Sequence, residues 1–146
     1  MVFKNQKELE RFIMKQSRQA LMKAQDKVYE IIHRFFEQYY QEFIPQEYIR
    51  TDKLLESLVK SQIVADGKGY KAEVYVDLNY LNYIYPYGSQ PSGQDVMDAA
   101  NEGRHGVEWT AKDDGTAIWS ESIQKLDANA INILKDMLIS EGIPIK

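Results

Sequence analysis

The first third of the chain contains a long segment without glycine or proline. Both residue types disfavour the interior of an α-helix, and neither occurs in residues 5–43. Apolar residues recur along this segment at steps of three, four and seven, the spacing of one face of a helix. These apolar positions are Leu9, Phe12, Ile13, Ala20, Leu21, Ala24, Val28, Ile31, Ile32, Phe35, Phe36, Tyr39 and Phe43. The segment therefore predicts one helix, about 58 Å long at a rise of 1.5 Å per residue.

Both ends of this helix carry recognisable signals. Asn5 is suited to the N-cap position, and Glu8 follows three positions later, as in a capping box. The residue before a proline avoids helical backbone, so the helix should end before Pro45. A helix of this length exceeds the width of a small domain, and its apolar residues are denser in the C-terminal half. We therefore expect the N-terminal half to project towards a partner.

A short helix and a β-hairpin are predicted next, within residues 45–90. Thr51 can cap a helix whose inward side chains are Leu54, Leu55 and Leu58. The segments SQIVAD and KAEVYVDLNYLNYIY then flank the glycine-rich turn GKG. Apolar and polar residues alternate over residues 72–78, which is the pattern of a strand with one buried face.

The C-terminal part is predicted to contain two helices around a long loop. QDVMDAANEG is typical of a short helix ended by Gly103, and residues 101–116 form a polar, glycine-bounded loop. Asp127 is a suitable N-cap for a last helix, and Gly142 a suitable stop. The expected apolar face of this helix consists of Ile131, Leu134, Met137 and Leu138.

These elements predict a single α+β domain over residues 1–146, in which a long N-terminal helix and a C-terminal helix pack on a small antiparallel sheet. Its four parts are the long helix (1–44), the short helix and hairpin (45–90), a helix with a long loop (91–126) and the C-terminal helix (127–146).

Composition excludes several classes of protein. The absence of cysteine excludes disulfides, thiol nucleophiles and cysteine-based metal sites. The formal net charge of −4 argues against a dedicated nucleic-acid-binding protein, which usually carries a basic face. No apolar run approaches the roughly 20 residues needed to span a membrane, and the first residues lack the apolar core of a signal peptide. We therefore expect a soluble, cytoplasmic protein.

No catalytic, metal-binding or cofactor-binding residue is assigned. His33 has no second ligand at a metal-binding spacing. His105 lies among Glu102, Arg104 and Glu108, but no nucleophile motif accompanies it, because Ser120 and Ser122 lack a GxSxG setting. The sequence also contains no nucleotide-binding glycine loop. A small hydrolase built around His105 remains an alternative.

The stretch YIRTDKLLESLV, residues 48–59, resembles a short signature of the tail-completion, or head–tail joining, proteins of tailed bacteriophages. The family pattern is a long N-terminal helix, a proline, an RTG-x-L-x-x-S element, a β-hairpin and a C-terminal helix. Here the element maps onto Arg50, Thr51, Leu54 and Ser57, and Asp52 stands where the family has glycine. LNYLNYIYPYG is similar to the family's strand after the hairpin, and DVMDAANEGRHG to its helix and glycine-rich loop.

The resemblance implies a structural protein of the virion neck or tail, assembled in the host cytoplasm. It implies a homo-oligomeric ring, typically of six copies, that joins the phage connector to the tail tube. DNA would pass through the lumen without sequence-specific binding. The alternative is a non-enzymatic cytoplasmic adaptor or antitoxin-like module that binds a partner through the long helix.

Candidate interface residues follow from this implied assembly. Tyrosine, tryptophan and arginine are common in protein interfaces because they combine a large contact area with a polar group. The expected contacts come from the tyrosine-rich segment, from the loop of residues 101–116 and from the start of the C-terminal region. The candidates are Tyr80, Tyr83, Tyr85, Tyr87, Arg104, His105, Trp109 and Trp119.

Overall fold

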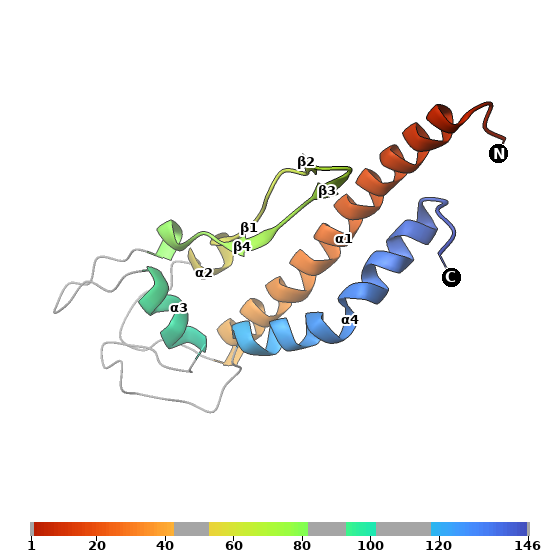
Figure 1. The fold of residues 1–146 in the computed structure, drawn as a ribbon. Helices are drawn as coiled ribbons and strands as arrows, with labels where there is room; N and C mark the ends of the chain where they lie inside the picture. Colours follow the sequence, from red (N-terminus) through yellow and green to blue (C-terminus); the bar gives the residue numbers. More distant parts are fainter. Residues whose placement is uncertain (1, 43–52, 82–92, 102–117, 146) are drawn as a thin grey trace.

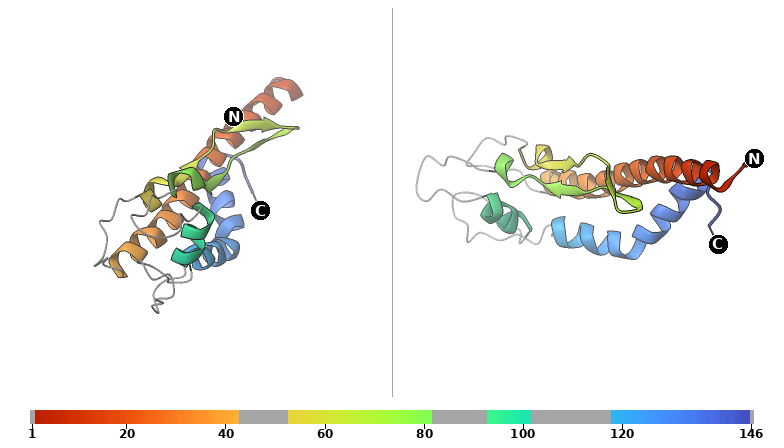
Figure 2. Two further views of the ribbon diagram at one scale, coloured as in Figure 1. Left: turned by 90° about the vertical axis from the view of Figure 1, so that its left-hand side faces the viewer. Right: turned by 45° about the horizontal axis from the view of Figure 1, so that its top comes forward.

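Two long antiparallel helices form the frame of the protein, as a computed structural model shows (Figure 1). The structure describes residues 2–42, 53–81, 93–101 and 118–145. Helix α1 spans Gln6–Glu42 and helix α4 spans Ile118–Ser140. The shorter elements lie along one side of this pair (Figure 2). In chain order they are α2 (Lys53–Glu56), β1 (Leu58–Lys60), β2 (Val64–Asp66), β3 (Gly69–Lys71), β4 (Val74–Val76), the 3₁₀ helix η1 (Leu78–Leu81) and α3 (Gly93–Asn101). The α+β class and the arrangement of helices and sheet predicted from the sequence are confirmed.

Helix α1 begins at the predicted cap. The Asn5 side chain accepts a hydrogen bond from the Glu8 backbone N–H at 2.9 Å, and the Glu8 carboxylate accepts one from the Lys4 N–H at 2.6 Å. One backbone donor of the first turn, at Glu8, and one of the preceding segment, at Lys4, are thereby satisfied. The rings of Phe3 and Phe12 also pack together, with centroids 5.1 Å apart. These contacts confirm the helix start and stabilise it locally.

The β-strands form one hairpin with an irregularity in its middle. At the base β1 pairs with β4, with Lys60 opposite Val74, and at the tip β2 pairs with β3, with Val64 opposite Lys71. Between these pairs, the three residues 61–63 oppose the two residues 72–73, which is the pattern of a β-bulge. The turn at the tip contains Gly67, whose φ of 60° suits glycine. The predicted hairpin and its GKG turn are confirmed.

The strand predicted over residues 71–85 ends earlier than expected. The Asp77 carboxylate accepts a hydrogen bond from the Asn79 N–H at 3.1 Å, which bends the chain into η1. This Asx turn ends the strand before Leu78, although Leu78 continues the alternation of apolar and polar residues. Helix α3 then begins against η1, where the backbone of Gly93 approaches Leu78 closely: an added Cβ would lie 2.1 Å from the Leu78 carbonyl oxygen.

Helix α4 differs from its prediction at its start and in its inner face. It begins at Ile118 rather than at Asp127, because Ser122 and Leu126 are buried and hold the preceding turns against the core. Ile131 and Leu134 are 76% and 40% exposed, so their assignment to the inner face was wrong.

The inner face of α4 is set instead by residues that continue from Ser122 and Leu126 at steps of seven and four. These are Ile133 and Met137, both half-buried. Near its middle α4 bends (Figure 1), and the midpoint of its span is Asn129, whose amide donates to the Lys125 carbonyl at 2.8 Å. Such side-chain bonds to the preceding turn often accompany helix bends.

The predicted stop of α4 at Gly142 is confirmed. Gly142 has a φ of 84°, its N–H donates to Ile139 at 3.0 Å, and the Ile143 N–H donates to Leu138 at 3.0 Å. This pair of bonds is a Schellman motif, which satisfies carbonyls at the helix end.

The hydrophobic core lies at the C-terminal half of α1, where the sequence is densest in apolar residues. Five other elements each contribute one buried side chain to it. The core consists of Ile32 and Phe36 with Leu54, Leu58, Leu81, Met97 and Leu126. The hairpin tip and the N-terminal half of α1 contribute none of these residues.

Candidate interaction surfaces

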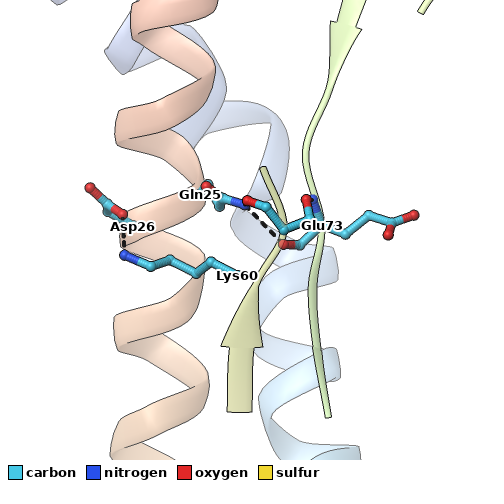
Figure 3. A network of polar contacts seen from close by, with 5 residues as sticks. Gln25, Asp26, Lys60 and Glu73 are labelled. Carbon is cyan, nitrogen blue, oxygen red and sulfur yellow. Dashed lines mark hydrogen bonds and ion pairs between the residues drawn. The ribbon is translucent and has the colours of Figure 1, made fainter. Parts of the chain in front are cut away.

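A polar clamp attaches the hairpin to α1. The Gln25 side-chain amide donates two hydrogen bonds of 2.9 Å, one to the Ser61 carbonyl and one to the Glu73 carbonyl (Figure 3). Both partners are acceptors, so the amide nitrogen must face them. The Ser61 hydroxyl in turn accepts from the Glu73 N–H at 2.8 Å. Gln25 is buried, and it satisfies the Ser61 carbonyl at the bulge. It is also a second donor to the Glu73 carbonyl, which accepts from the Ser61 N–H at 2.9 Å.

A second contact holds the hairpin base to the same helix. The Lys60 ammonium lies 2.8 Å from the Asp26 carboxylate (Figure 3). It also lies 5.3 Å from the centroid of the Tyr29 ring. The hydrogen bond that Lys60 donates to Asp26 raises the pKa of Lys60 above its usual 10.5, against a smaller lowering by burial. Because the pKa is raised, this contribution to stability is complete below pH 10.5 and is lost as the pH rises through the higher folded value.

A shallow groove of about 280 Å³ lies between β4 and α3. Its apolar wall consists of Val74, Val76, Leu78 and Met97. At its rim the Gln94 amide donates to the Asp98 carboxylate at 2.8 Å. This lining can accept an apolar side chain. It offers no arrangement of nucleophile and base for catalysis.

One row of exposed apolar side chains lies on the N-terminal half of α1. Leu9 and Ile13 are 38% and 42% exposed, and they share a helix face with the buried Ala20 and Ala24 at steps of four, seven and four. Lys23 beside them pairs with Glu141 at the end of α4. We infer that Ala20 and Ala24 face α4. Because α1 extends beyond the end of α4 (Figures 1 and 2), the same face continues without a cover.

A second apolar row lies on α4. Ile131 and Leu134 are exposed, and the half-buried Leu138 continues their face at steps of three and four. We call the Leu9–Ile13 pair the α1 row and the Ile131–Leu134–Leu138 set the α4 row. Contiguous exposed apolar side chains of this kind are typical of protein contacts.

The sequence-predicted site residues are only partly placed. Tyr80 lies on η1 and is 45% exposed. The other candidates Tyr83, Tyr85, Tyr87, Arg104, His105 and Trp109 lie outside the described residues, and Trp119 lies in α4 without a described side chain. The sequence analysis did not single out Gln25 or the two apolar rows as sites. A glutamine within an otherwise apolar helix face was the available signal for Gln25.

The motif residues have a structural role where they are described. Leu54 is a core residue, and Ser57 is fully buried with its hydroxyl donating to the Leu54 carbonyl at 2.6 Å. Arg50 and Thr51 lie outside the described residues. Leu54 and Ser57 thus fix the start of the hairpin against α1.

Within the described parts of the chain, no cluster of three or more histidine or carboxylate side chains is placed to hold a metal ion. Across those parts, no helix is long and apolar enough to cross a membrane.

Comparison with known proteins gives one family. The family model described as YomN matches residues 5–140, which includes every element from α1 to α4. The family name is that of a Bacillus phage-derived protein, which indicates a phage-related protein. Neither the curated proteins nor the solved structures gave a match.

Proposed function

Since the chain belongs to the phage-related YomN family, we propose that it is a structural protein of the virion. In this proposal it forms a ring at the head–tail interface of a long-tailed phage and joins the connector to the tail tube. The protein acts by binding neighbouring chains and catalyses no reaction. Tail and neck are its site of action, and DNA passes through the ring without sequence-specific binding.

The order of elements supports this proposal. A long N-terminal helix comes first, and the short segment with Leu54 and Ser57 follows it. A hairpin comes next, and the chain ends with a C-terminal helix. This is the order expected for the head–tail joining proteins that the sequence resembles.

The observation that carries the proposal is the presence of two different uncovered apolar rows on one chain. The α1 row continues a face that already packs on α4 within the chain, and the α4 row lies on a different element. A contact between the α1 row of one copy and the α4 row of the next is heterologous, because the two surfaces differ. Heterologous contacts produce closed rings when the rotation between copies closes.

The test is the assembly state of two single variants and their mixture, measured by sedimentation velocity. Leu9→Asp places a charge in the α1 row, and Ile131→Asp places one in the α4 row. Each variant alone should remain monomeric, whereas the wild type should form a closed oligomer. The mixture should stop at dimers, since each variant retains one intact surface. Ile139→Asp is the matched control: Ile139 is also exposed on α4 but lies off the α4 row, so this variant should assemble normally.

Other outcomes would contradict the heterologous contact. Assembly by Ile131→Asp together with failure of Leu9→Asp would indicate a symmetric contact between α1 rows. A wild-type protein that stays monomeric at high concentration would oppose self-assembly and favour an adaptor that binds a different chain through α1.

A further inference from the structure

Four cationic side chains form a stripe along the N-terminal half of α1. Their steps of four, four and three place them on one helix face. Every member is exposed. The members of this cationic stripe are Lys7, Arg11, Lys15 and Arg18. The stripe is about 17 Å long at 1.5 Å per residue.

No side chain of the stripe has an ionic partner among the described residues. The two carboxylates within residues 4–18 have other hydrogen-bond partners. Glu8 accepts from the Lys4 backbone N–H, and Glu10 accepts from the Gln6 side-chain amide at 2.8 Å. Residues 4–18 therefore carry a formal charge of +3 in a chain whose total is −4. Positive charge is concentrated on this segment and unneutralised along its stripe.

The stripe lies opposite the α1 row. On a helical wheel of 100° per residue, Leu9 and Ile13 fall about 160–200° from the centre of the stripe. Continued along the helix, the stripe's face reaches Gln25 and Tyr29, which contact the hairpin. The projecting half of α1 thus offers an apolar surface on one side and a cationic surface on the other.

We propose that the cationic stripe binds the phosphate backbone of duplex DNA without regard to base sequence. Duplex DNA presents one negative charge per about 1.7 Å of its axis, so a row of cations about 17 Å long lies beside a length of duplex that carries about ten charges of opposite sign. Contacts of lysine and arginine side chains with phosphates do not distinguish one base sequence from another. This inference rests on the proposed function for its choice of DNA, since DNA would pass through the ring.

A lipid surface fits the same helix less well. A helix that binds a membrane buries its apolar face at the boundary between headgroups and acyl chains. With Leu9 and Ile13 in that position, the stripe would point away from the headgroups because it lies on the opposite side. The rest of the chain carries a net negative charge, which repels a polyanion and favours its binding at the cationic stripe.

The experiment measures binding of the purified full chain to a labelled 30-base-pair duplex by fluorescence anisotropy, between 50 and 200 mM NaCl. With four phosphate contacts the slope of log K against log salt should be about −3.6. Lys7→Gln with Lys15→Gln should reduce the slope by about 1.8 and weaken binding at 50 mM salt. The control Lys27→Gln with Lys125→Gln removes the same charge from exposed positions off the stripe, and should bind as the wild type does.

Three outcomes would overturn the inference. They are no duplex binding at 50 mM NaCl, equal loss in the control, and tighter binding to vesicles containing phosphatidylserine or to poly-glutamate than to the duplex. The Lys7→Gln and Lys15→Gln double variant is also assayed by sedimentation. Normal assembly together with lost DNA binding supports the proposed contact between the stripe and DNA. Lost assembly in this variant would show that the stripe makes a protein contact, and would overturn the proposal. Failure of DNA binding alone leaves the ring proposal intact.

Discussion

Replacing Gly93 with alanine is expected to lower the free energy of unfolding by about 1–3 kcal/mol, the typical cost of overpacking a tight contact. The new methyl group would lie 2.1 Å from the Leu78 carbonyl oxygen and 2.9 Å from its carbonyl carbon. Both are backbone atoms, so no side-chain rotation can relieve the overlap. The first turn of α3 must move away from η1, and the adjacent Met97 and Leu81 then lose packing in the core.

The measurement is urea-induced unfolding followed by circular dichroism, with Gly69→Ala as the control. A Cβ at Gly69 would meet its nearest atom, the Asp66 carbonyl oxygen, at 3.9 Å, which is ordinary contact. The control should therefore change stability much less than Gly93→Ala. Equal stability of Gly93→Ala and the wild type would contradict the close packing of α3 against η1.

Replacing Gln25 with glutamate is expected to lower the free energy of unfolding by about 1–3 kcal/mol or more at neutral pH. A buried acceptor loses its donor, and a negative charge is buried beside two carbonyl oxygens. The substitution keeps the size of the side chain and replaces its N–H donors with a charged acceptor. The hairpin should then detach from the middle of α1 first, since the Ser61 and Glu73 carbonyls are both held by this amide.

Hydrogen exchange of the hairpin amides and thermal unfolding measure this effect. Gln16→Glu is the control: Gln16 is half-buried in the same helix and makes no hydrogen bond through its side chain among the described residues. Burial raises the pKa of the introduced carboxyl at position 25, so stability should recover as the pH falls through that raised value and the protonated group becomes a donor again. A variant at position 25 that is no less stable than the control would rule out the clamp.

Local signals in the sequence predicted the long helix, the hairpin turn and the end of α4. The Asn5–Glu8 cap, the glycine turn and the Gly142 stop each act within a few residues, so their geometry follows from the residues themselves. The class of the fold followed from these elements.

The errors arose where distant contacts override local signals. Asp127 has the chemistry of an N-cap, yet α4 begins earlier because Ser122 and Leu126 pack on the core. The same packing rotates Ile131 and Leu134 outwards. The contact at Gly93 depends on how η1 approaches α3, which no local pattern records.

The candidate site could be predicted in part. The projecting half of α1 follows from its length and from the uneven density of apolar residues. Tyr80 is exposed, and its role in an interface stays a prediction. The α4 row could not be found, because its residues were assigned to the inner face. The clamp through Gln25 required knowledge of the hairpin bulge, which depends on the register of two strand pairs.

The most direct test of the proposed role is the position of this protein in phage particles produced from the genome that encodes it. Cryo-electron microscopy of purified particles, with a small tag on the chain, locates it. The proposal predicts a closed ring of copies between the connector and the tail tube, with the central passage open for DNA. Particles that lack the protein, or that contain it only elsewhere in the virion, would contradict the proposal.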